Sequence, residues 1–191
     1  MHSSIILSKN KEEFTFRELK ASDSKMLGSF FLNLSANTKS KFGPHPLTMG
    51  YADELCNAID ETEIQRFIVV KDEEIAGYFI LDFNIYLPES VRYKQSAIIL
   101  ESSLDPVFAP CIADKYQNSG IASCAMSFII KIAQQANLRR IILMGGTQEP
   151  NILARSFYSK FGFKEYATFY TEHNQLNNID MMLELNGNAT P

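Results

Sequence analysis

The stretch Y-Q-N-S-G-I-A at 116–122 joins an extended apolar segment to a long amphipathic helix. Residues 107–113 before it have the apolar character of a strand, and residues 120–137 after it repeat apolar side chains at helical spacing. A glycine at the start of such a helix lets backbone N–H groups approach an anion without a Cβ in the way. The stretch therefore predicts a strand, a turn and a helix, and it makes the turn a candidate anion site.

The rest of the chain alternates between strand and helix patterns. Alternation and short apolar runs predict strands over residues 14–19, 66–70, 75–83, 97–100, 107–113, 140–144, 164–170 and 180–185. Helical spacing predicts helices that begin near Asp23, Thr48, Gly120 and Asn151. We expect Gly145-Gly146 to end a strand and Gly162 to end the last helix, while 84–95, broken by Pro88, has no predicted element. Hairpins followed by a strand–helix–strand crossover predict an α/β fold with a mixed sheet.

Length and composition narrow the class of protein. The 191 residues suffice for one domain, expected over residues 1–186 with a tail at 187–191. With 18 basic and 22 acidic residues the net charge is -4, which disfavours a sequence-independent nucleic-acid surface. We expect no nucleic-acid partner.

Cysteine usage and hydropathy indicate a compartment. Cys56, Cys111 and Cys124 are odd in number and lack the spacing of metal ligands, so neither a disulfide framework nor a metal site is expected. The apolar run at 5–7 is too short for a signal peptide, and no stretch is long enough to span a bilayer. The expectation is a cytoplasmic protein with no membrane partner.

Two motifs each follow a predicted strand and open a predicted helix: Q-N-S-G-I-A at 117–122 and N-I-L-A-R-S-F-Y-S-K-F-G-F at 151–163. Together they resemble the GNAT superfamily of acetyl-CoA-dependent N-acyltransferases. The family's pattern Q/R-x-x-G-x-G/A is matched by Gln117, Gly120 and Ala122. Its pattern N-x-x-A-x-x-x-Y-x-x-x-G-F is matched by Asn151, Ala154, Tyr158, Gly162 and Phe163. The resemblance is strong from about residue 110 to 163 and topological elsewhere.

The resemblance implies a fold, a cofactor and a set of site residues. The fold is a GNAT-like mixed, mostly antiparallel twisted sheet with helices on both faces. The co-substrate is acetyl-CoA. Backbone amides at the start of the helix would bind its pyrophosphate, and the preceding strand would pair with its pantetheine arm. The residues that the resemblance assigns to the cofactor are Cys111, Ile112, Gln117, Asn118, Ser119, Gly120, Ile121, Ala122, Ser123 and Asn151.

The second motif supplies the expected catalytic residue. Tyr158 matches the tyrosine that, in the family, gives a proton or a hydrogen bond to the departing sulfur. Its alternative role is packing, since Phe157 and Phe161 are its neighbours. Asn151 matches the family's pantetheine-binding asparagine, and it is also a residue that caps helices, so both roles stay open.

The general base is left open by the sequence. Glu101, Asp105 and Glu149 are candidates, and removal of the proton through ordered water is an equal alternative. His45, in the F-G-P-H-P loop at 42–46, could bind or deprotonate an acceptor, although a rigid loop with a partly buried histidine is favoured. Cys124 is best explained by packing.

We therefore expect an N-acetyltransferase that transfers an acetyl group from acetyl-CoA to a primary amine by direct attack in a ternary complex. The expected partners are acetyl-CoA and a small amine, and the family leaves a homodimer open. The alternatives are a non-catalytic acyl-CoA-binding sensor or regulatory module, and an acetyltransferase that acts on a protein amine.

Overall fold

The structure is a computed structural model, and it describes residues 3–59, 63–85, 87–172 and 175–185. Its contacts divide the chain into two compact units. Unit 1 comprises Met1–Ile80 and Ala109–Ile129, and unit 2 comprises Leu81–Phe108 and Ile130–Pro191. Across the described ranges the strands number eight and form a mixed, mostly antiparallel sheet flanked by helices, which confirms the predicted fold class.

Unit 1 contains the strand order β1-β2-β3-β4-β5. Its strands are β1 (Ser4–Leu7), β2 (Glu13–Glu18), β3 (Ile64–Lys71), β4 (Glu74–Asp82) and β5 (Val107–Ile112), of which the last two continue into unit 2. The β1–β2 and β2–β3 pairs are antiparallel, with Ile6 opposite Phe14 and Phe16 opposite Val69. Phe14 and Phe16 are both buried, as their alternation in the sequence predicts.

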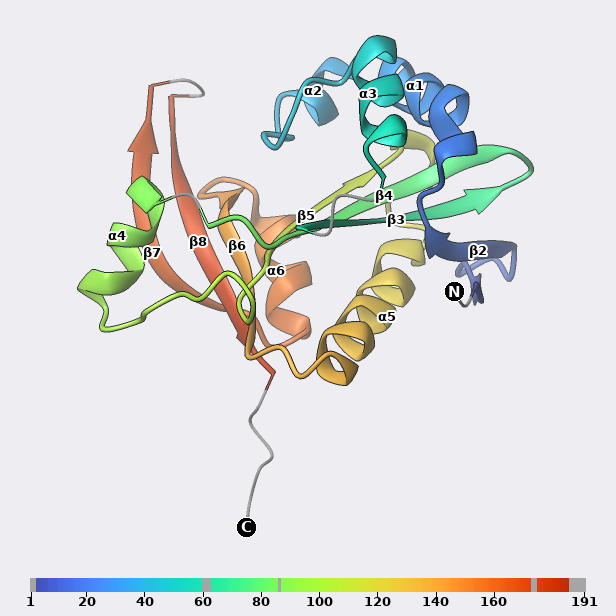
Figure 1. Ribbon diagram of the computed structural model, residues 1–191. Coiled ribbons are helices and arrows are strands. Elements are labelled where there is room, and N and C mark those ends of the chain that lie inside the picture. Colours follow the sequence, from blue (N-terminus) through green and yellow to red (C-terminus); the bar gives the residue numbers. More distant parts are fainter. Residues whose placement is uncertain (1–2, 60–62, 86, 173–174, 186–191) are drawn as a thin grey trace. The chain divides into compact units, whose positions relative to one another are not determined.

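The helices of unit 1 cover both faces of these strands. On one face lie α1 (Ser24–Asn33), α2 (Ala36–Lys39) and α3 (Met49–Asn57), and on the other the first part of α5 (Ile121–Gln135) (Figure 1). Leu27, Phe30 and Phe31 occur at helical spacing on α1 and are buried against the sheet. Each such side chain contributes about 1.5–3 kcal/mol on burial. This core fixes the sheet that carries the glycine turn.

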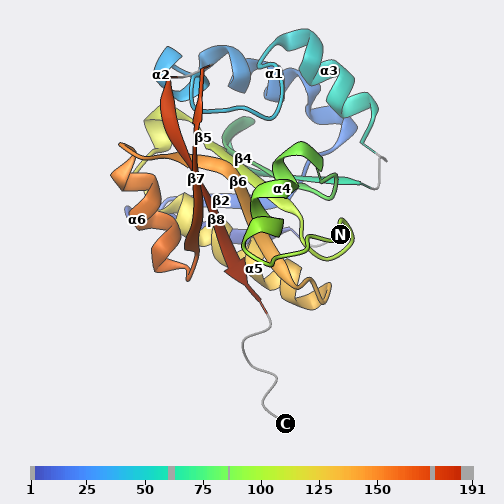
Figure 2. The ribbon, with the colours of Figure 1, turned by 90° about the vertical axis from the view of Figure 1, so that its left-hand side faces the viewer.

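Unit 2 contains β5, β6 (Arg140–Gln148), β8 (Leu176–Glu184) and β7 (Lys164–Thr171), in that order. Val107 of β5 pairs in parallel with Ile142 of β6, and β8 pairs antiparallel with both β6 and β7. The helices α4 (Leu87–Gln95) and α6 (Ile152–Lys160) lie on opposite faces of these strands (Figure 2). Tyr93 of α4 packs against Ile142 and Met182 in the core.

One predicted strand is wrong, and two elements lie where the sequence predicts none. Residues 97–100 form a turn and an irregular segment after α4, because Ala97 adopts a φ of 59° that ends the helix. Residues 87–95, left unassigned, form α4, with Pro88 in the first turn, where a missing N–H costs little. The strand β1 lies where the sequence predicts no element, and the four-residue helix α2 is separated from α1 by an extended residue, Leu34.

The strand β6 does not end at Gly145-Gly146 but continues to Gln148 through a shift of register between Leu143 and Thr147. A buried carboxylate holds this bulge, because Asp180 accepts the Gly145 N–H at 2.6 Å and pairs with Arg92 at 2.7 Å. Gly145 has a φ of 61°, so the glycine permits the bulge instead of ending the strand.

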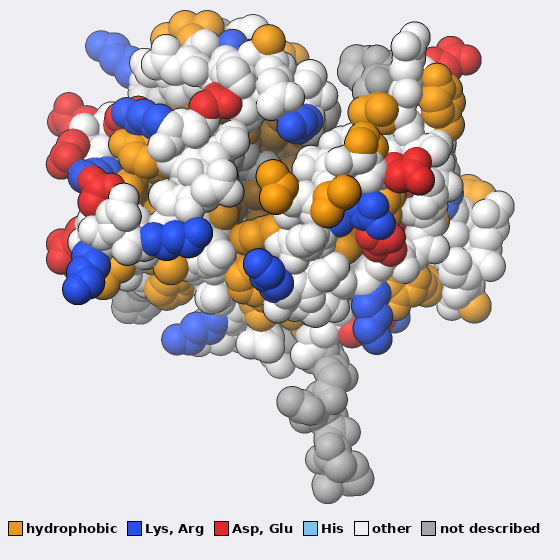
Figure 3. Space-filling model, turned by 180° about the vertical axis from the view of Figure 1, so that it is seen from behind, with side chains coloured by type: hydrophobic (Ala, Val, Ile, Leu, Met, Phe, Trp, Pro, Cys, Tyr) orange, Lys and Arg blue, Asp and Glu red, His pale blue; other side chains and the backbone are white. Residues whose placement is uncertain are grey.

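The surface carries both signs of charge. Figure 3 shows Lys, Arg, Asp and Glu side chains interspersed on one face, with apolar atoms between them. Within the described ranges, none of the helices has the length and apolar character of a membrane span. No His, Cys, Asp and Glu side chains of the described part gather in a group that would hold a metal ion.

Candidate functional site

The glycine turn, residues 117–122 of unit 1, connects the end of β5 to α5 through a short 3-10 helix, Asp114–Tyr116. Asn118 and Gly120 have φ values of 61° and 92°, and this alternation directs backbone N–H groups outward in succession. A Cβ on Gly120 would stand 3.1 Å from Cγ of Lys9. A glycine is therefore needed here mainly because of the positive φ, and secondly because a Cβ would crowd the Lys9 side chain.

The backbone amides of residues 117–123 fall into two sets. Three are used inside the protein: Gln117 N–H donates to the Asp114 carbonyl at 3.2 Å, Ser119 N–H to Tyr116 at 3.4 Å and Ser123 N–H to Gly120 at 3.1 Å. In the described part of the chain, no hydrogen bond engages the other four N–H groups, those of Asn118, Gly120, Ile121 and Ala122. These four lie at the N-terminus of a 15-residue helix, where partial positive charge accumulates. They fit a phosphate-like anion.

The side chain of Gln117 holds the turn together. Its Nε2 lies 3.2 Å from Thr38 Oγ1 and 3.4 Å from the Ile112 carbonyl, so both amide hydrogens have acceptors within the protein. Its predicted contact with the cofactor stays a prediction, and its observed contacts are with the strand end and α2.

The end of β5 favours one backbone donor over the other. Ala113 N–H donates to the Ala76 carbonyl of β4 at 3.0 Å. Because successive N–H groups of a strand point to opposite sides, Cys111 N–H points toward β4 as well, whereas Ile112 N–H points away. Of the two residues predicted to meet the pantetheine arm, the geometry therefore favours Ile112. Pro110 shares its direction but has no N–H. Burial raises the pKa of the Cys111 thiol to about 12, which keeps it protonated.

The second motif lies in unit 2. Asn151 is the N-cap of α6, and its Oδ1 accepts the Ala154 N–H at 3.3 Å while its Nδ2 lies 3.4 Å from Gln148 Oε1. Gly162 follows the helix with a φ of 89°, which confirms it as the left-handed residue that ends the helix. The capping role of Asn151 is thus confirmed, and its contact with pantetheine stays a prediction.

Tyr158 is buried on the inner side of α6, with 5% of its surface exposed. Its ring meets Phe157 and Phe163 edge-on at centroid distances of 5.3 and 5.4 Å. Burial raises the pKa of the Tyr158 phenol above its ordinary value, so the hydroxyl keeps its proton at neutral pH. Within the described residues no hydrogen bond engages this hydroxyl. Packing and proton donation are therefore compatible, because the ring packs while the hydroxyl stays unengaged.

The carboxylates predicted as candidate bases all have partners. Glu101 pairs with Arg139 at 2.8 Å, and Asp105 is fully buried beside the same guanidinium. Glu149 accepts a hydrogen bond from Asn177 Nδ2 at 2.8 Å. These contacts favour the other predicted route, proton removal through water.

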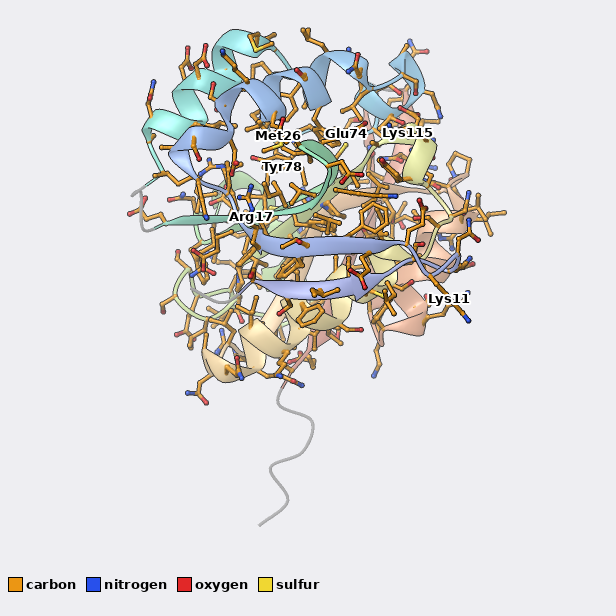
Figure 4. All side chains as sticks on the ribbon, turned by 90° about the vertical axis from the view of Figure 1, so that its right-hand side faces the viewer. Lys11, Arg17, Met26, Glu74, Tyr78 and Lys115 are labelled. Atoms are coloured by element: carbon orange, nitrogen blue, oxygen red, sulfur yellow. The ribbon has the colours of Figure 1, made fainter. Side chains whose placement is uncertain are left out.

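His45 lies in a cluster of aromatic rings in unit 1. Its ring centroid is 4.9 Å from those of Phe42 and Tyr51 and 5.4 Å from that of Phe31. Nδ1 donates to the Pro46 carbonyl at 2.8 Å, which leaves Nε2 to accept from the Tyr78 hydroxyl at 3.2 Å. Burial lowers the pKa of His45, so it is neutral at pH 7. Figure 4 shows Tyr78 beneath α1, and the contacts support the rigid-loop interpretation.

The structure adds residues that the sequence did not single out. Lys9 N–H donates to the Ser119 carbonyl at 2.7 Å, and its side chain runs beside Gly120. The Asp114 carboxylate accepts from the Thr38 hydroxyl, whose oxygen lies 3.2 Å from Gln117 Nε2. The only available signal for Lys9 was the apolar run at 5–7, which forms β1 and brings the N-terminal turn to the glycine turn.

Comparison with known families agrees with this geometry. The model of the acetyltransferase (GNAT) family matches residues 33–163, which is more than half of the chain. The chain belongs to the GNAT acetyltransferase family. The match spans both the glycine turn and the Asn151–Phe163 motif, on which the resemblance in the sequence rests.

Solved structures share the fold at low identity. The GNAT domain of PAT from S. lividans has a TM-score of 0.72 at 14% identity, covering 95% of this chain and 96% of that one. A ribosomal-protein-S5-alanine acetyltransferase from Vibrio fischeri has 0.70 at 17%, covering 97% and 100%. A spermidine N-acetyltransferase chimera from Vibrio cholerae and hSSAT has 0.65 at 18%, covering 90% and 95%. Among curated proteins, none has significant sequence similarity to this chain.

Proposed function

We propose that the protein is an acetyl-CoA-dependent N-acetyltransferase that transfers the acetyl group to a primary amine by direct attack in a ternary complex. The observation that carries this proposal is the set of four unengaged N–H groups at the start of α5, in a chain of the GNAT family. We place the reaction in the cytoplasm, because a reducing compartment suits the three free cysteines.

The glycine turn binds the anionic end of the co-substrate. The four amides and the helix dipole stabilise a pyrophosphate without any basic side chain in the motif. Ile112 N–H donates to the pantetheine arm or polarises the carbonyl that is attacked. Asn151 adds a side-chain amide as the proposed second contact. When bound, acetyl-CoA supplies an acyl group activated as a thioester.

Tyr158 is the proposed general acid. Its phenol keeps its proton because burial raises its pKa. The hydroxyl hydrogen-bonds the sulfur and gives it the proton as the C–S bond breaks and the N–C bond forms, and solvent then returns a proton to the phenolate. The amine must be neutral to attack, and water is the proposed acceptor of its proton, since Glu101, Asp105 and Glu149 have partners in the protein.

The proposed acceptor is a small primary amine. Two of the proteins with a similar fold are named for amine acceptors, spermidine in one and a ribosomal protein's alanine in the other. A net charge of -4 favours a cationic amine modestly through long-range attraction. A protein amine is the second candidate, because the alanine acetyltransferase shares the fold over 97% of this chain.

Two measurements test the proposal in sequence. Calorimetric titration with acetyl-CoA should show binding, and saturating acetyl-CoA should raise the melting temperature, because it binds only the folded state. Release of free CoA thiol is then followed with spermidine, with other small amines and with a peptide that begins with alanine. Thiol release that requires an amine supports the enzyme. Binding without release for any amine identifies a sensor, and absence of binding at saturation rejects the proposal.

A further inference from the structure

Asp114, the first residue after Ala113 at the end of β5, binds a segment 79 positions away in the sequence. Its carboxylate accepts three hydrogen bonds from the start of α2: Ser35 N–H at 2.8 Å, Ser35 Oγ at 2.6 Å and Thr38 Oγ1 at 2.6 Å. Ser35 is also the N-cap of α2, since its Oγ accepts the Thr38 N–H. One exposed carboxylate thus fixes the start of α2 against the glycine turn, and all of these groups lie in unit 1.

The contact continues through Thr38 to the motif residue Gln117. The hydroxyl of Thr38 has a single hydrogen, and Asp114 accepts it. The Thr38 oxygen is therefore an acceptor for Gln117 Nε2 at 3.2 Å, whose second hydrogen faces the Ile112 carbonyl at 3.4 Å. The chain of contacts therefore joins the last residue of β5 to Gln117, the first residue of the glycine turn.

The charge of Asp114 makes two effects separable. Hydrogen bonds from Ser35 and Thr38 lower the pKa of Asp114 to about 2, so the group is ionised at any physiological pH. A negative charge close to an anion-binding turn weakens anion binding by Coulomb repulsion. A carboxylate that holds the turn in its binding conformation strengthens it. Neutralising Asp114 without changing its shape therefore shifts affinity in opposite directions under the two effects.

We propose that Asp114 is a positioning residue for the cofactor, which acts through Thr38 and Gln117 and couples the 35–38 segment to acetyl-CoA binding. The inference rests on the proposed function, because it assigns the glycine turn to acetyl-CoA. Binding of acetyl-CoA then orders residues 35–38, and loosening of that segment lowers the affinity for acetyl-CoA. The geometry supports coupling because every contact is within one unit and the Thr38 hydroxyl contacts both the Asp114 carboxylate and Gln117.

The test is Asp114→Asn, with the dissociation constant of acetyl-CoA as the readout. We expect about a tenfold weaker affinity, as for loss of charge-assisted hydrogen bonds, with kcat at saturating acetyl-CoA within about twofold. Thr38→Val, which keeps charge and volume, should weaken binding in the same direction. The double variant should bind acetyl-CoA more weakly than the wild type, but by less than the product of the two single fold-losses, because Asp114 and Thr38 act through the same contacts.

Asp53→Asn is the matched control, since Asp53 is an exposed carboxylate that accepts from Ser24 and joins α3 to α1 in the same unit. It should leave the acetyl-CoA affinity unchanged. Tighter or unchanged binding in Asp114→Asn, with a normal melting temperature, overturns the inference. Hydrogen exchange gives a second readout: acetyl-CoA should slow exchange at residues 35–38 in the wild type and lose this effect in Asp114→Asn. Absence of acetyl-CoA binding by the wild type would reject the proposed function instead.

Discussion

The two units present their motifs in opposite ways. In unit 1 the glycine turn offers backbone N–H groups on a partly exposed surface, and the side chains around it serve to hold the backbone. In unit 2 the Asn151–Phe163 motif offers a buried side chain, the Tyr158 phenol, among aromatic rings. The first should therefore depend on backbone conformation, and the second on the identity of one functional group.

The largest effect is expected from Tyr158→Phe. The variant keeps the packed ring and removes the hydroxyl, so kcat should fall by about 10²–10⁴ while the dissociation constant of acetyl-CoA stays within about twofold. Stopped-flow or steady-state thiol release measures the first quantity, and calorimetry the second. Because the pKa of Tyr158 is raised, no loss of turnover from its ionisation is expected in the wild type below about pH 10.

Tyr170→Phe is the control for this substitution, because Tyr170 is an exposed tyrosine of β7 in the same unit. It should leave both constants unchanged. Equal turnover in Tyr158→Phe and wild type would reduce Tyr158 to a packing residue and leave the proton of the leaving group to water.

The next effect is expected from Gly120→Ala. Alanine is strained at a φ of 92°, so the turn must change its conformation and redirect the N–H groups. We expect the dissociation constant of acetyl-CoA to rise at least tenfold, with kcat at saturation largely retained. Gly50→Ala in α3 is the control, since a Cβ there meets nothing within 4 Å and alanine favours the helix. Unchanged affinity in Gly120→Ala would contradict a binding role for these amides.

The contrast between the units also explains what the sequence could predict. The glycine turn, α6 and the buried face of β2 follow from local signals: a glycine, a capping asparagine and alternating phenylalanines. The continuation of β6 through Gly145 does not, because pairing with β8 and the carboxylate of Asp180 outweigh the local tendency of glycine to end a strand. Elements that depend on local signals could be predicted from the sequence, and those that depend on contacts between distant residues could not.

The same reason accounts for the missed parts of the site. Asp114 meets Ser35 across 79 positions, and Lys9 meets Ser119 only because β1 adds to the sheet. No spacing rule connects such positions. The predicted helix starts stood near residues 120 and 151, and α5 and α6 begin at Ile121 and Ile152, since caps and turn residues are local.

A smaller effect is expected at Asn151, where two roles can be separated. Asn151→Ala removes the cap and should lower the free energy of unfolding by about 1 kcal/mol. Asn151→Asp keeps an oxygen for the Ala154 N–H and suits the helix dipole, so stability should hold. It loses the amide donor, so KM for acetyl-CoA should rise about threefold if one neutral hydrogen bond is lost. An Asp variant with normal KM would leave Asn151 with the capping role alone.

The smallest effect is expected from Lys9, which tests whether the turn of unit 1 is a backbone site alone. Within the described residues its ammonium has no ion-pair partner, and its stem lies beside Gly120. Lys9→Ala should weaken acetyl-CoA binding about twofold at low salt, and the difference should fade at high ionic strength. Lys11→Ala, from the same loop, is the control, because Lys11 points outward (Figure 4). Equal effects of the two substitutions would assign the change to net charge and leave the amides as the whole of the anion site.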